Sequence, residues 1–176
     1  MNYKKIDVDV MISQEEIQKR IKELAREIEK DYEGKELICL GLLKGSIMFM
    51  ADLLKEVNLP LAMDFMKVSS YHGGTDSTGV VKILKDVDLD ITGKNILIIE
   101  DIIDTGLTLQ YVKNFLGSKK PNEIKVCSLL DKPSRRKVEM VGEYIGFEIP
   151  DEFVLGYGLD YDEYYRNLPF VGKVSK

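Results

Sequence analysis

One short apolar run in this chain ends abruptly in a cluster of acidic residues. The sequence NILIIEDIIDTGLTL spans Asn95–Leu109. Its first part, Asn95–Ile99, is short, β-branched and uninterrupted, which is typical of a strand buried on both faces of a parallel sheet. Glu100, Asp101 and Asp104 follow it. Clustered carboxylates repel one another and are costly to desolvate, so packing gives no reason for them. A bound cation, or hydroxyl groups that donate hydrogen bonds to them, would supply one.

The residues after these acids have the pattern of a helix start. Thr105, Gly106 and Thr108 are small residues around a flexible glycine, and Leu107–Leu116 carries apolar residues at helical spacing. A strand, a turn and a helix start leave free backbone N–H groups that bind phosphate together with the helix dipole. A lone Asp-Thr-Gly is also ordinary loop composition. The whole string, however, indicates a site for a sugar phosphate.

Length and composition indicate an ordinary globular protein. The 176 residues suit one domain, residues 1–176, and 44% of them are hydrophobic and 31% charged, as in soluble proteins. No apolar run approaches the roughly 20 residues needed to span a bilayer. The first ten residues, MNYKKIDVDV, lack the apolar core of a signal peptide. We therefore expect a cytoplasmic protein that makes no membrane contact.

Charge and side-chain chemistry exclude several function classes. The formal net charge is −5 and no basic block occurs, so nucleic acid is not an expected partner. His72 is the only histidine, which excludes a two-histidine mechanism or zinc site. Cys39 and Cys127 lie in apolar runs without metal-ligand spacing. They are expected to be buried free thiols, which suits a reducing compartment.

Strand and helix patterns alternate along the chain. A capping box at Ser13 starts a helix that runs to about Tyr32. Further helices are expected at Ser46–Val57 and after Thr105, and strands at Glu36–Leu42, Ala62–Val68, Val80–Leu84, Asn95–Ile99, Ile124–Leu130, Tyr144–Glu148 and Phe153–Gly156. This order predicts an α/β fold with a mostly parallel central sheet and helices on both faces. Such sheets bind ligands outside the carboxyl ends of their strands, where the loops at Lys44, Asp104 and Lys132 would meet.

Two further segments have distinctive patterns. Ile47–Ala51 is apolar all round, so this helix either buries a second face against another subunit or lies deep in the core. Ser69–Gly79 contains three glycines and five serines or threonines and cannot build a core of its own. We interpret it as a mobile hairpin arm, or lid.

Five segments together resemble the hypoxanthine-guanine type of purine phosphoribosyltransferase. They occur in the family's order over nearly the whole chain: LLKGS at Leu42–Ser46, VSSYHGGTDSTG at Val68–Gly79, EDIIDTGLT at Glu100–Thr108, LLDKPSRR at Leu129–Arg136, and FEIPDEFVLGYGLDYDEYYRNLPFVG at Phe147–Gly172. The last segment discriminates most, because the sugar-phosphate motif is shared with other base specificities and with regulators.

The resemblance implies a fold, a reaction and partners. The fold is the type I phosphoribosyltransferase fold, with a small hood formed by the chain termini and the mobile lid hairpin. The reaction is purine salvage: a 6-oxopurine (hypoxanthine or guanine) displaces diphosphate from 5-phosphoribosyl 1-diphosphate, giving IMP or GMP. Mg²⁺ is the implied cofactor, and a homodimer or homotetramer is the implied assembly.

The resemblance also assigns roles at the sugar-phosphate end. Glu100 and Asp101 would hold the ribose hydroxyls and help organise Mg²⁺, and Asp104 would be the catalytic base beside purine N7. Backbone amides and hydroxyls for the 5′-phosphate would come from Asp104, Thr105, Gly106, Leu107 and Thr108. Some family members have lysine where Leu107 stands, so that position offers only its amide. Ser70 and Tyr71 would belong to the catalytic lid.

The remaining roles concern diphosphate and purine. Leu43, Lys44 and Gly45 resemble the diphosphate loop, where the family often has a non-proline cis peptide, and Arg166 would contact diphosphate. Lys132 would donate to the purine 6-oxo group, Phe153 would stack on the ring and Val154 would offer backbone groups. Asp160, which the resemblance also assigns to the purine site, resembles a ligand of a second Mg²⁺. Structural alternatives remain open here: surface positions for Lys44 and Lys132, a core position for Phe153, and an exposed acidic turn for Asp160.

Competing functions have weaker support. Asp88-Leu89-Asp90-Ile91-Thr92 mimics a phosphatase nucleophile motif, but the required strand does not precede it. Some regulators of this fold keep the sugar-phosphate motif and bind nucleic acid, usually through a basic face that an acidic chain lacks. Transfer to adenine or a pyrimidine is opposed by Lys132 and by Phe153–Asp160.

Overall fold

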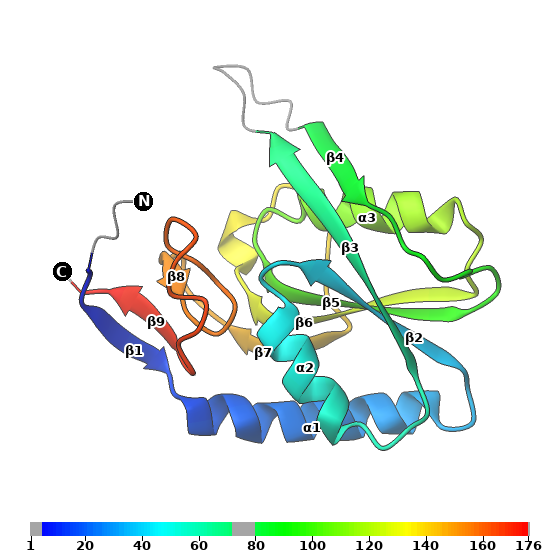
Figure 1. Cartoon of the computed structure of the whole chain (residues 1–176), viewed down its shortest axis with the longest axis horizontal. Helices are drawn as coiled ribbons and strands as arrows, with labels where there is room; N and C mark the ends of the chain where they lie inside the picture. The colour runs from blue at the N-terminus through cyan, green and yellow to red at the C-terminus, as the bar shows by residue number, and fades with distance from the viewer. Residues whose placement is uncertain (1–4, 72–79, 176) are drawn as a thin grey trace.

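A six-stranded sheet forms the centre of the protein. The computed structural model describes residues 5–71 and 80–175. The sheet has the order β4-β3-β2-β5-β6-β7, and all neighbouring strands are parallel except the β3–β4 hairpin (Figure 1). Its strands are β2 (Leu37–Leu43), β3 (Ala62–Tyr71), β4 (Val80–Lys85), β5 (Asn95–Ile103), β6 (Glu123–Asp131) and β7 (Tyr144–Glu148). The predicted α/β class is confirmed.

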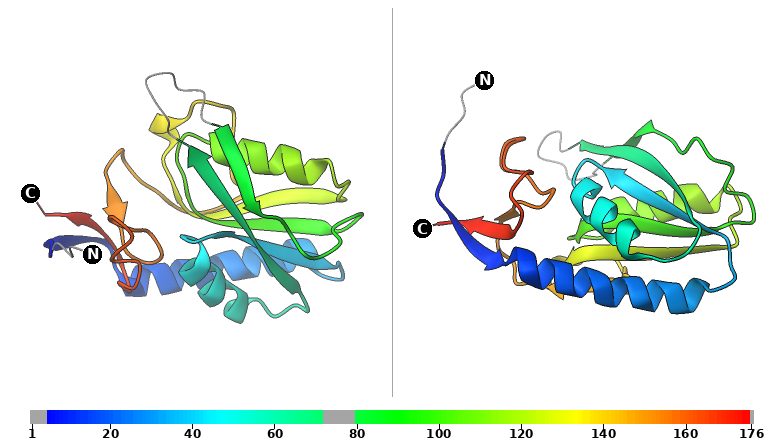
Figure 2. Two further views of the ribbon diagram at one scale, coloured as in Figure 1. Left: turned by 45° about the horizontal axis from the view of Figure 1, so that its top comes forward. Right: turned by 60° about the horizontal axis from the view of Figure 1, so that its bottom comes forward.

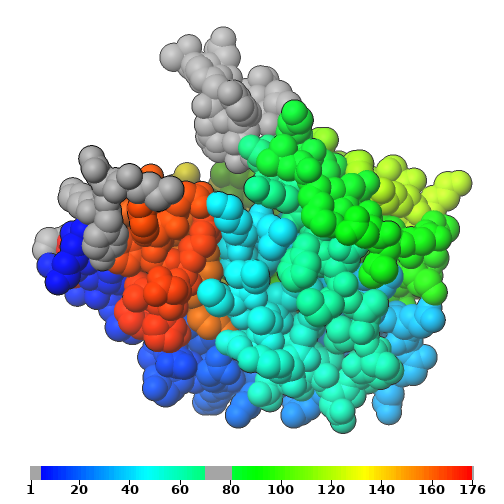
Figure 3. All heavy atoms as spheres, viewed as in Figure 1, coloured from blue at the N-terminus to red at the C-terminus, as the bar shows by residue number. Residues whose placement is uncertain are grey.

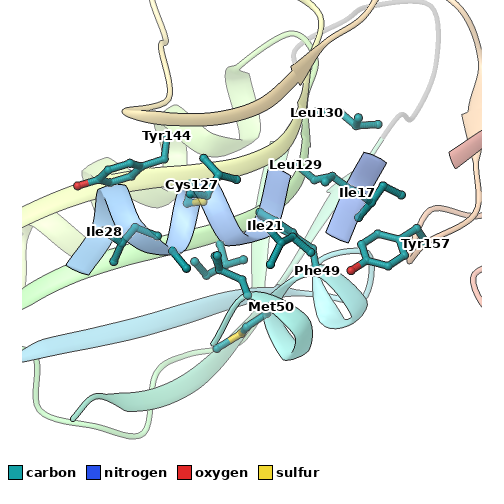
Figure 4. Close-up of a cluster of buried hydrophobic side chains, with 14 of the residues drawn as sticks. Ile17, Ile21, Ile28, Phe49, Met50, Cys127, Leu129, Leu130, Tyr144 and Tyr157 are labelled. Carbon is teal, nitrogen blue, oxygen red and sulfur yellow. The ribbon is translucent and has the colours of Figure 1, made fainter. Parts of the chain in front are cut away.

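Helices cover both faces of this sheet. On one face α1 (Gln14–Tyr32) and α2 (Ile47–Glu56) bury Ile21 and Phe49 against Leu97 and Cys127. On the other, α3 (Leu107–Gly117) buries Val112 in a second apolar cluster. Figure 2 shows α1 running along one side of the sheet and α3 along the other. Figure 4 shows part of the first cluster, in which side chains from α1 and α2 meet the sheet.

The chain termini form a separate small sheet. It consists of β1 (Val8–Ile12), β9 (Val171–Val174) and β8 (Val154–Leu155), paired antiparallel in that order. We call this sheet, together with residues 149–170 that precede β9, the hood. It lies beside the carboxyl ends of the central strands (Figure 1). The expected hood of chain termini is confirmed. In the central sheet, a short 3₁₀ turn at Pro133–Arg135 follows β6.

Two predicted strand ends were wrong: β3 continues past Val68 to Tyr71, and the central strand β5 is also longer than predicted. The prediction ended the central strand at Ile99 and placed Glu100 and Asp101 after it, but β5 continues to Ile103. The neighbouring strand β6 is the reason, because it supplies backbone partners as far as Asp131, which pairs with Ile103. Both acids therefore lie within the sheet.

Most of the predicted lid lies outside the residues that the structure describes. Ser70 and Tyr71 end β3, and their backbones pair with Val81 and Val80 of β4. The antiparallel base of the predicted hairpin is thus present. Residues 72–79, including His72, lie outside the described residues.

Candidate active site

The pleat of β5 sends its two adjacent acids to opposite faces of the sheet. Successive side chains along a strand alternate between faces. Glu100 follows Ile96 and Ile98, which pack with α3, whereas Asp101 follows Leu97 and Ile99, which pack with α1 and α2. Each acid therefore meets a different loop. Burial raises the pKa of both carboxyl groups, and the neighbouring Asp101 raises that of Glu100 further.

Glu100 lines a small pocket at the start of α3. The pocket has a volume of about 110 Å³ and is lined by Glu100, Ile102, Ile103, Asp104, Thr105, Gly106, Thr108 and Leu109. Gly106 caps α3 with φ +80°, a left-handed conformation that suits glycine, and a Cβ there would lie within 3.2 Å of Met140, Val138 and Arg136. Oε2 of Glu100 is buried there without a hydrogen-bond partner among the described residues. The predicted phosphate loop and the ribose acid are thus brought together.

Arginines that follow β6 hold the loop that contains Asp104. Nε of Arg135 lies 2.9 Å from Oδ1 of Asp104. Arg136 donates to the backbone carbonyls of Ile103 and Asp104 and forms a close ion pair with Asp131. The sequence analysis gave these arginines no individual role; they appeared only within the family segment Leu129–Arg136. Their position directly after the Lys-Pro-Ser turn was the signal, because the carboxyl ends of neighbouring parallel strands place their following loops side by side.

Asp101 packs directly against the predicted diphosphate loop. The Leu43–Lys44 peptide bond at the end of β2 is cis. A Cβ added to Gly45 would lie 1.6 Å from Oδ2 of Asp101. Only glycine allows this approach between the loop and the strand. The loop that sequence reasoning assigned to diphosphate therefore adjoins the acid that it assigned to ribose.

Hood residues approach the same loop from the other side. The ammonium of Lys44 pairs with Glu163. Arg166 pairs with Asp160 at 2.7 Å, and its Nη1 donates to the carbonyl of Gly158 at 2.7 Å. The sequence analysis did not single out Glu163, because its role depends on how the hood folds back onto the loop. Asp160 also accepts from the backbone N–H of Glu163 at 2.9 Å, so it lies in a partly exposed turn that the ion pair joins to Arg166.

The predicted purine residues form the third part of the site. Lys132 is only 6% exposed, and its Nζ donates to the carbonyl of Glu152 at 2.5 Å. Phe153 is 59% exposed, with its ring edge-on to Tyr161, whereas Val154 is buried. A solvated turn for Lys132 and a core position for Phe153 are therefore wrong. A buried ammonium group beside an exposed aromatic face can bind a flat ring that carries a hydrogen-bond acceptor.

A larger cavity lies at the opposite end of the sheet. It has a volume of about 630 Å³ and is lined by residues that include Leu37, Leu59, Leu61 and Ala62 at the amino ends of β2 and β3. Its lining is mainly apolar. We assign the functional site to the carboxyl edge, because the acids, the cations and the free helix start converge there.

Comparisons with known proteins agree with this geometry. Residues 12–162 match the family model described as phosphoribosyl transferase domain. A hypoxanthine-guanine phosphoribosyltransferase of Staphylococcus aureus is 54% identical over 167 residues, covering 95% of this chain and 93% of that protein. The chain belongs to the hypoxanthine-guanine phosphoribosyltransferase family.

Solved structures of hypoxanthine-guanine phosphoribosyltransferases superpose closely on this chain. One from Bacillus anthracis has a TM-score of 0.92 and 51% identity, and covers 97% of this chain and 100% of its own. A hypoxanthine phosphoribosyltransferase from Staphylococcus aureus has a TM-score of 0.91 and 53% identity, and covers 95% and 91%. No helix in the described part of this chain is long and apolar enough to cross a membrane.

The donor set of this family member suits a hard cation that is bound mainly by substrate. Within residues 5–71 and 80–175, no group of three acidic, histidine or cysteine side chains converges on one point. Oε2 of Glu100 nonetheless lacks a hydrogen-bond partner among the described residues, and burial raises the pKa of Asp101, whose Oδ1 accepts from the backbone N–H of Ile102. Mg²⁺ takes one or two carboxylates together with substrate oxygens, and the residues present fit that pattern.

Asp101 is predicted to destabilise the free protein at neutral pH. Its pKa rises from 3.8 to about 6 on folding, so between these values the unfolded chain binds fewer protons and stability falls as pH rises. Asp101→Asn should therefore raise stability by about 3 kcal/mol at pH 7.5 without metal, and by much less at pH 4.5. Thermal melts at both pH values measure this. Asp7→Asn, which removes an exposed carboxylate, serves as the control. A gain in stability from Asp101→Asn that was the same at both pH values would contradict the raised pKa of Asp101 in the folded protein.

Proposed function

We propose that this protein transfers the 5-phosphoribosyl group of 5-phosphoribosyl 1-diphosphate to hypoxanthine or guanine, giving IMP or GMP and diphosphate. One observation carries the proposal. The acids at the end of β5 and the phosphate loop after it lie next to the buried Lys132, which follows the neighbouring parallel strand β6. This arrangement supports a sugar-phosphate site beside a site for an oxo group.

The 5′-phosphate and the ribose occupy the α3 side of this site. Backbone amides of the loop from Asp104 to Thr108 bind the phosphate, and the dipole of α3 favours its charge. Glu100 accepts hydrogen bonds from the ribose hydroxyls, which supply the partners that its buried Oε2 lacks. Binding both the 5′-phosphate and the ribose hydroxyls of the donor positions its C1 for attack.

Lys132 selects the base. An ammonium group has three donors and no acceptor, so it matches a 6-oxo group and not the 6-amino group of adenine. In the free protein its donor is directed to the carbonyl of Glu152, next to Phe153. The exposed ring of Phe153 stacks on the purine, and the backbone of Val154 meets its edge.

Asp104 acts as the base for the purine proton. As purine N9 forms its bond to C1 and diphosphate leaves with the bonding electrons, N7 becomes more acidic and its proton passes to the Asp104 carboxylate. In the free protein Arg135 pairs with that carboxylate. Release of this contact frees an oxygen for the proton.

Mg²⁺ is part of the proposal. When bound, it neutralises charge on the diphosphate and holds the ribose hydroxyls in place. Glu100 and Asp101 support one ion from the ribose side. Asp160, which pairs with Arg166 in the free protein, supports a second on the diphosphate side. Lys44, the amide of Gly45 and Arg166 bind the diphosphate itself.

The lid completes the site. Closure of the arm that includes Ser70 and Tyr71 would exclude water from a sugar that carries developing positive charge. The β3–β4 pairing that ends at Tyr71, at the carboxyl end of β3, supports an arm on the active-site edge. The proposal extends to a cytoplasmic location, which the two buried free thiols, Cys39 and Cys127, support.

A regulator that binds nucleic acid is the second candidate. Such a protein would need a basic surface for phosphate contacts. The net charge of −5 argues against one, and the cations at the site, Lys44, Arg135 and Arg166, are each paired with a carboxylate. Catalysis is therefore the better supported function.

The direct test is a turnover assay. The protein is incubated with 5-phosphoribosyl 1-diphosphate and Mg²⁺ and with hypoxanthine, guanine or adenine, and nucleotide formation is followed by absorbance. We expect turnover with the two 6-oxopurines, little with adenine, and loss of activity when the metal is chelated. Equal rates with adenine would contradict the role of Lys132, and no nucleotide with any base would contradict the function.

Asp104→Asn should lower kcat by roughly 10²–10⁴-fold while changing the KM values far less, because an amide cannot accept the proton. Steady-state kinetics at saturating donor measures the effect. Asp151→Asn is the matched control, since Asp151 is the other carboxylate paired with Arg135. A loss of the same size in both variants would assign the effect to Arg135 and not to a base.

Self-association is predicted through α2. Phe49, Met50 and Leu53 of this helix are buried in the core, but Ile47 is 43% and Met48 39% exposed. A second copy that covers these side chains would form the expected homodimer, or part of a homotetramer. Sedimentation of the wild-type protein should show an oligomer. The substitution Met48→Glu should dissociate it, whereas the control Val141→Asp, which changes another exposed apolar residue, should leave the oligomer intact. A wild-type monomer would exclude this surface as an interface.

A further inference from the structure

Tyr157 occupies an unusual position in the hood. It lies between Gly156 and Gly158, and all three residues have positive φ, +90°, +48° and +101°. A non-glycine residue in this left-handed region costs roughly 1–2 kcal/mol, so something must hold it there. Its backbone N–H donates to the carbonyl of Leu168 at 2.9 Å, and its side chain is only 5% exposed. The turn therefore directs a tyrosine ring out of the hood and into the main core.

The hydroxyl of that ring ends on a charged acceptor in α2. Tyr157 donates to Oδ2 of Asp52 at 2.6 Å, and Gln18 of α1 donates to the same oxygen at 3.0 Å. Burial raises the pKa of Tyr157, so the hydroxyl keeps its proton and remains a donor. Figure 4 shows the ring at one end of the core cluster, near Ile17 and Phe49. Through the Asp52 carboxylate, the Tyr157 hydroxyl thus connects the hood to both α1 and α2.

The same turn touches the diphosphate loop. A Cβ added to Gly158 would lie 1.9 Å from the carbonyl oxygen of Gly45, so the two backbones are in direct contact. Gly158 also exchanges hydrogen bonds with Arg166: its N–H donates to the Arg166 carbonyl at 2.9 Å, and its carbonyl accepts from Nη1 at 2.7 Å. In Figure 3 the orange hood segment adjoins the cyan start of α2. The turn therefore fixes the loop and the arginine relative to one another.

We propose that Tyr157 is a positioning residue for the diphosphate end of the donor. Strand pairing does not join the hood sheet to the central sheet in the described parts of the chain, so their spacing rests on individual contacts, among them the Gly45–Gly158 backbone approach and the Tyr157–Asp52 hydrogen bond. The Tyr157–Asp52 hydrogen bond holds the turn against α2, the helix that follows the Lys44-Gly45 loop. It thereby keeps that loop and Arg166 at the separation that diphosphate requires.

The inference predicts a selective effect, and it rests on the proposed function. Lys132 follows β6 and Phe153 precedes the turn, so neither depends on the hydroxyl of Tyr157. Loss of the hydroxyl should weaken binding of the donor and of product diphosphate. The KM for purine and the kcat at saturating donor should change little.

Tyr157→Phe tests this, with Tyr144→Phe as a matched control. Tyr144 is 4% exposed and its hydroxyl also donates to an aspartate, Oδ2 of Asp31, at 2.6 Å. It lies at the opposite end of the same core cluster (Figure 4). We expect Tyr157→Phe to raise the donor KM and the inhibition constant of diphosphate about tenfold, with the purine KM within twofold. Tyr144→Phe should lower the melting temperature comparably and leave every kinetic constant within twofold.

Asp52→Ala breaks the same hydrogen bond from the helix side. It should reproduce the donor effect, and it keeps the test open should Tyr157→Phe fail to fold. Unchanged donor and diphosphate constants in either folded variant, or equal changes in the purine KM, would overturn the inference. An inactive wild-type protein would instead contradict the proposed function, so the two failures are distinguishable.

Discussion

Gly45 lies between a carboxylate of the central sheet and the backbone of the hood. A Cβ there would collide with Asp101, and a Cβ on Gly158 would collide with the carbonyl of Gly45. Three segments far apart in sequence therefore meet with no side chain between them. The diphosphate loop, the ribose acid and the hood that carries Asp160 and Arg166 take their relative positions from this contact. The site exists because the three backbones can approach so closely.

The charges of the site are paired internally before substrate binds. Lys44 pairs with Glu163, Arg166 with Asp160, and Arg135 with Asp104. These ion pairs are partly exposed, and such pairs contribute little to stability. They can therefore be exchanged for contacts with a polyanionic donor at small cost. Glu100 differs, because its buried oxygen has no partner among the described residues, and bound ribose would provide one.

Much of the fold was predictable because the hydrophobic pattern carries it. The capping box at Ser13 and the apolar face of α1 were read correctly, and the start of α3 after Gly106 likewise. The end of β5 was wrong, since the pairing of Ile103 with Asp131 on β6 decides where that strand stops. Local sequence around Glu100 contains no information about the length of a neighbouring strand. Glu163 and Tyr157 were missed for the same reason, because their partners lie more than 100 residues away.

By itself, the sequence determined the order of elements and the chemical character of each loop. Strand periods, the acids after an apolar run and the glycine before α3 are local properties, and local properties can be read along a chain. Only the tertiary structure decided which loops face one another, that Glu100 and Asp101 serve opposite faces of β5, and that Lys132 is buried beside an exposed Phe153. Those outcomes depend on strand register and on the docking of the hood, which are set by contacts between distant residues.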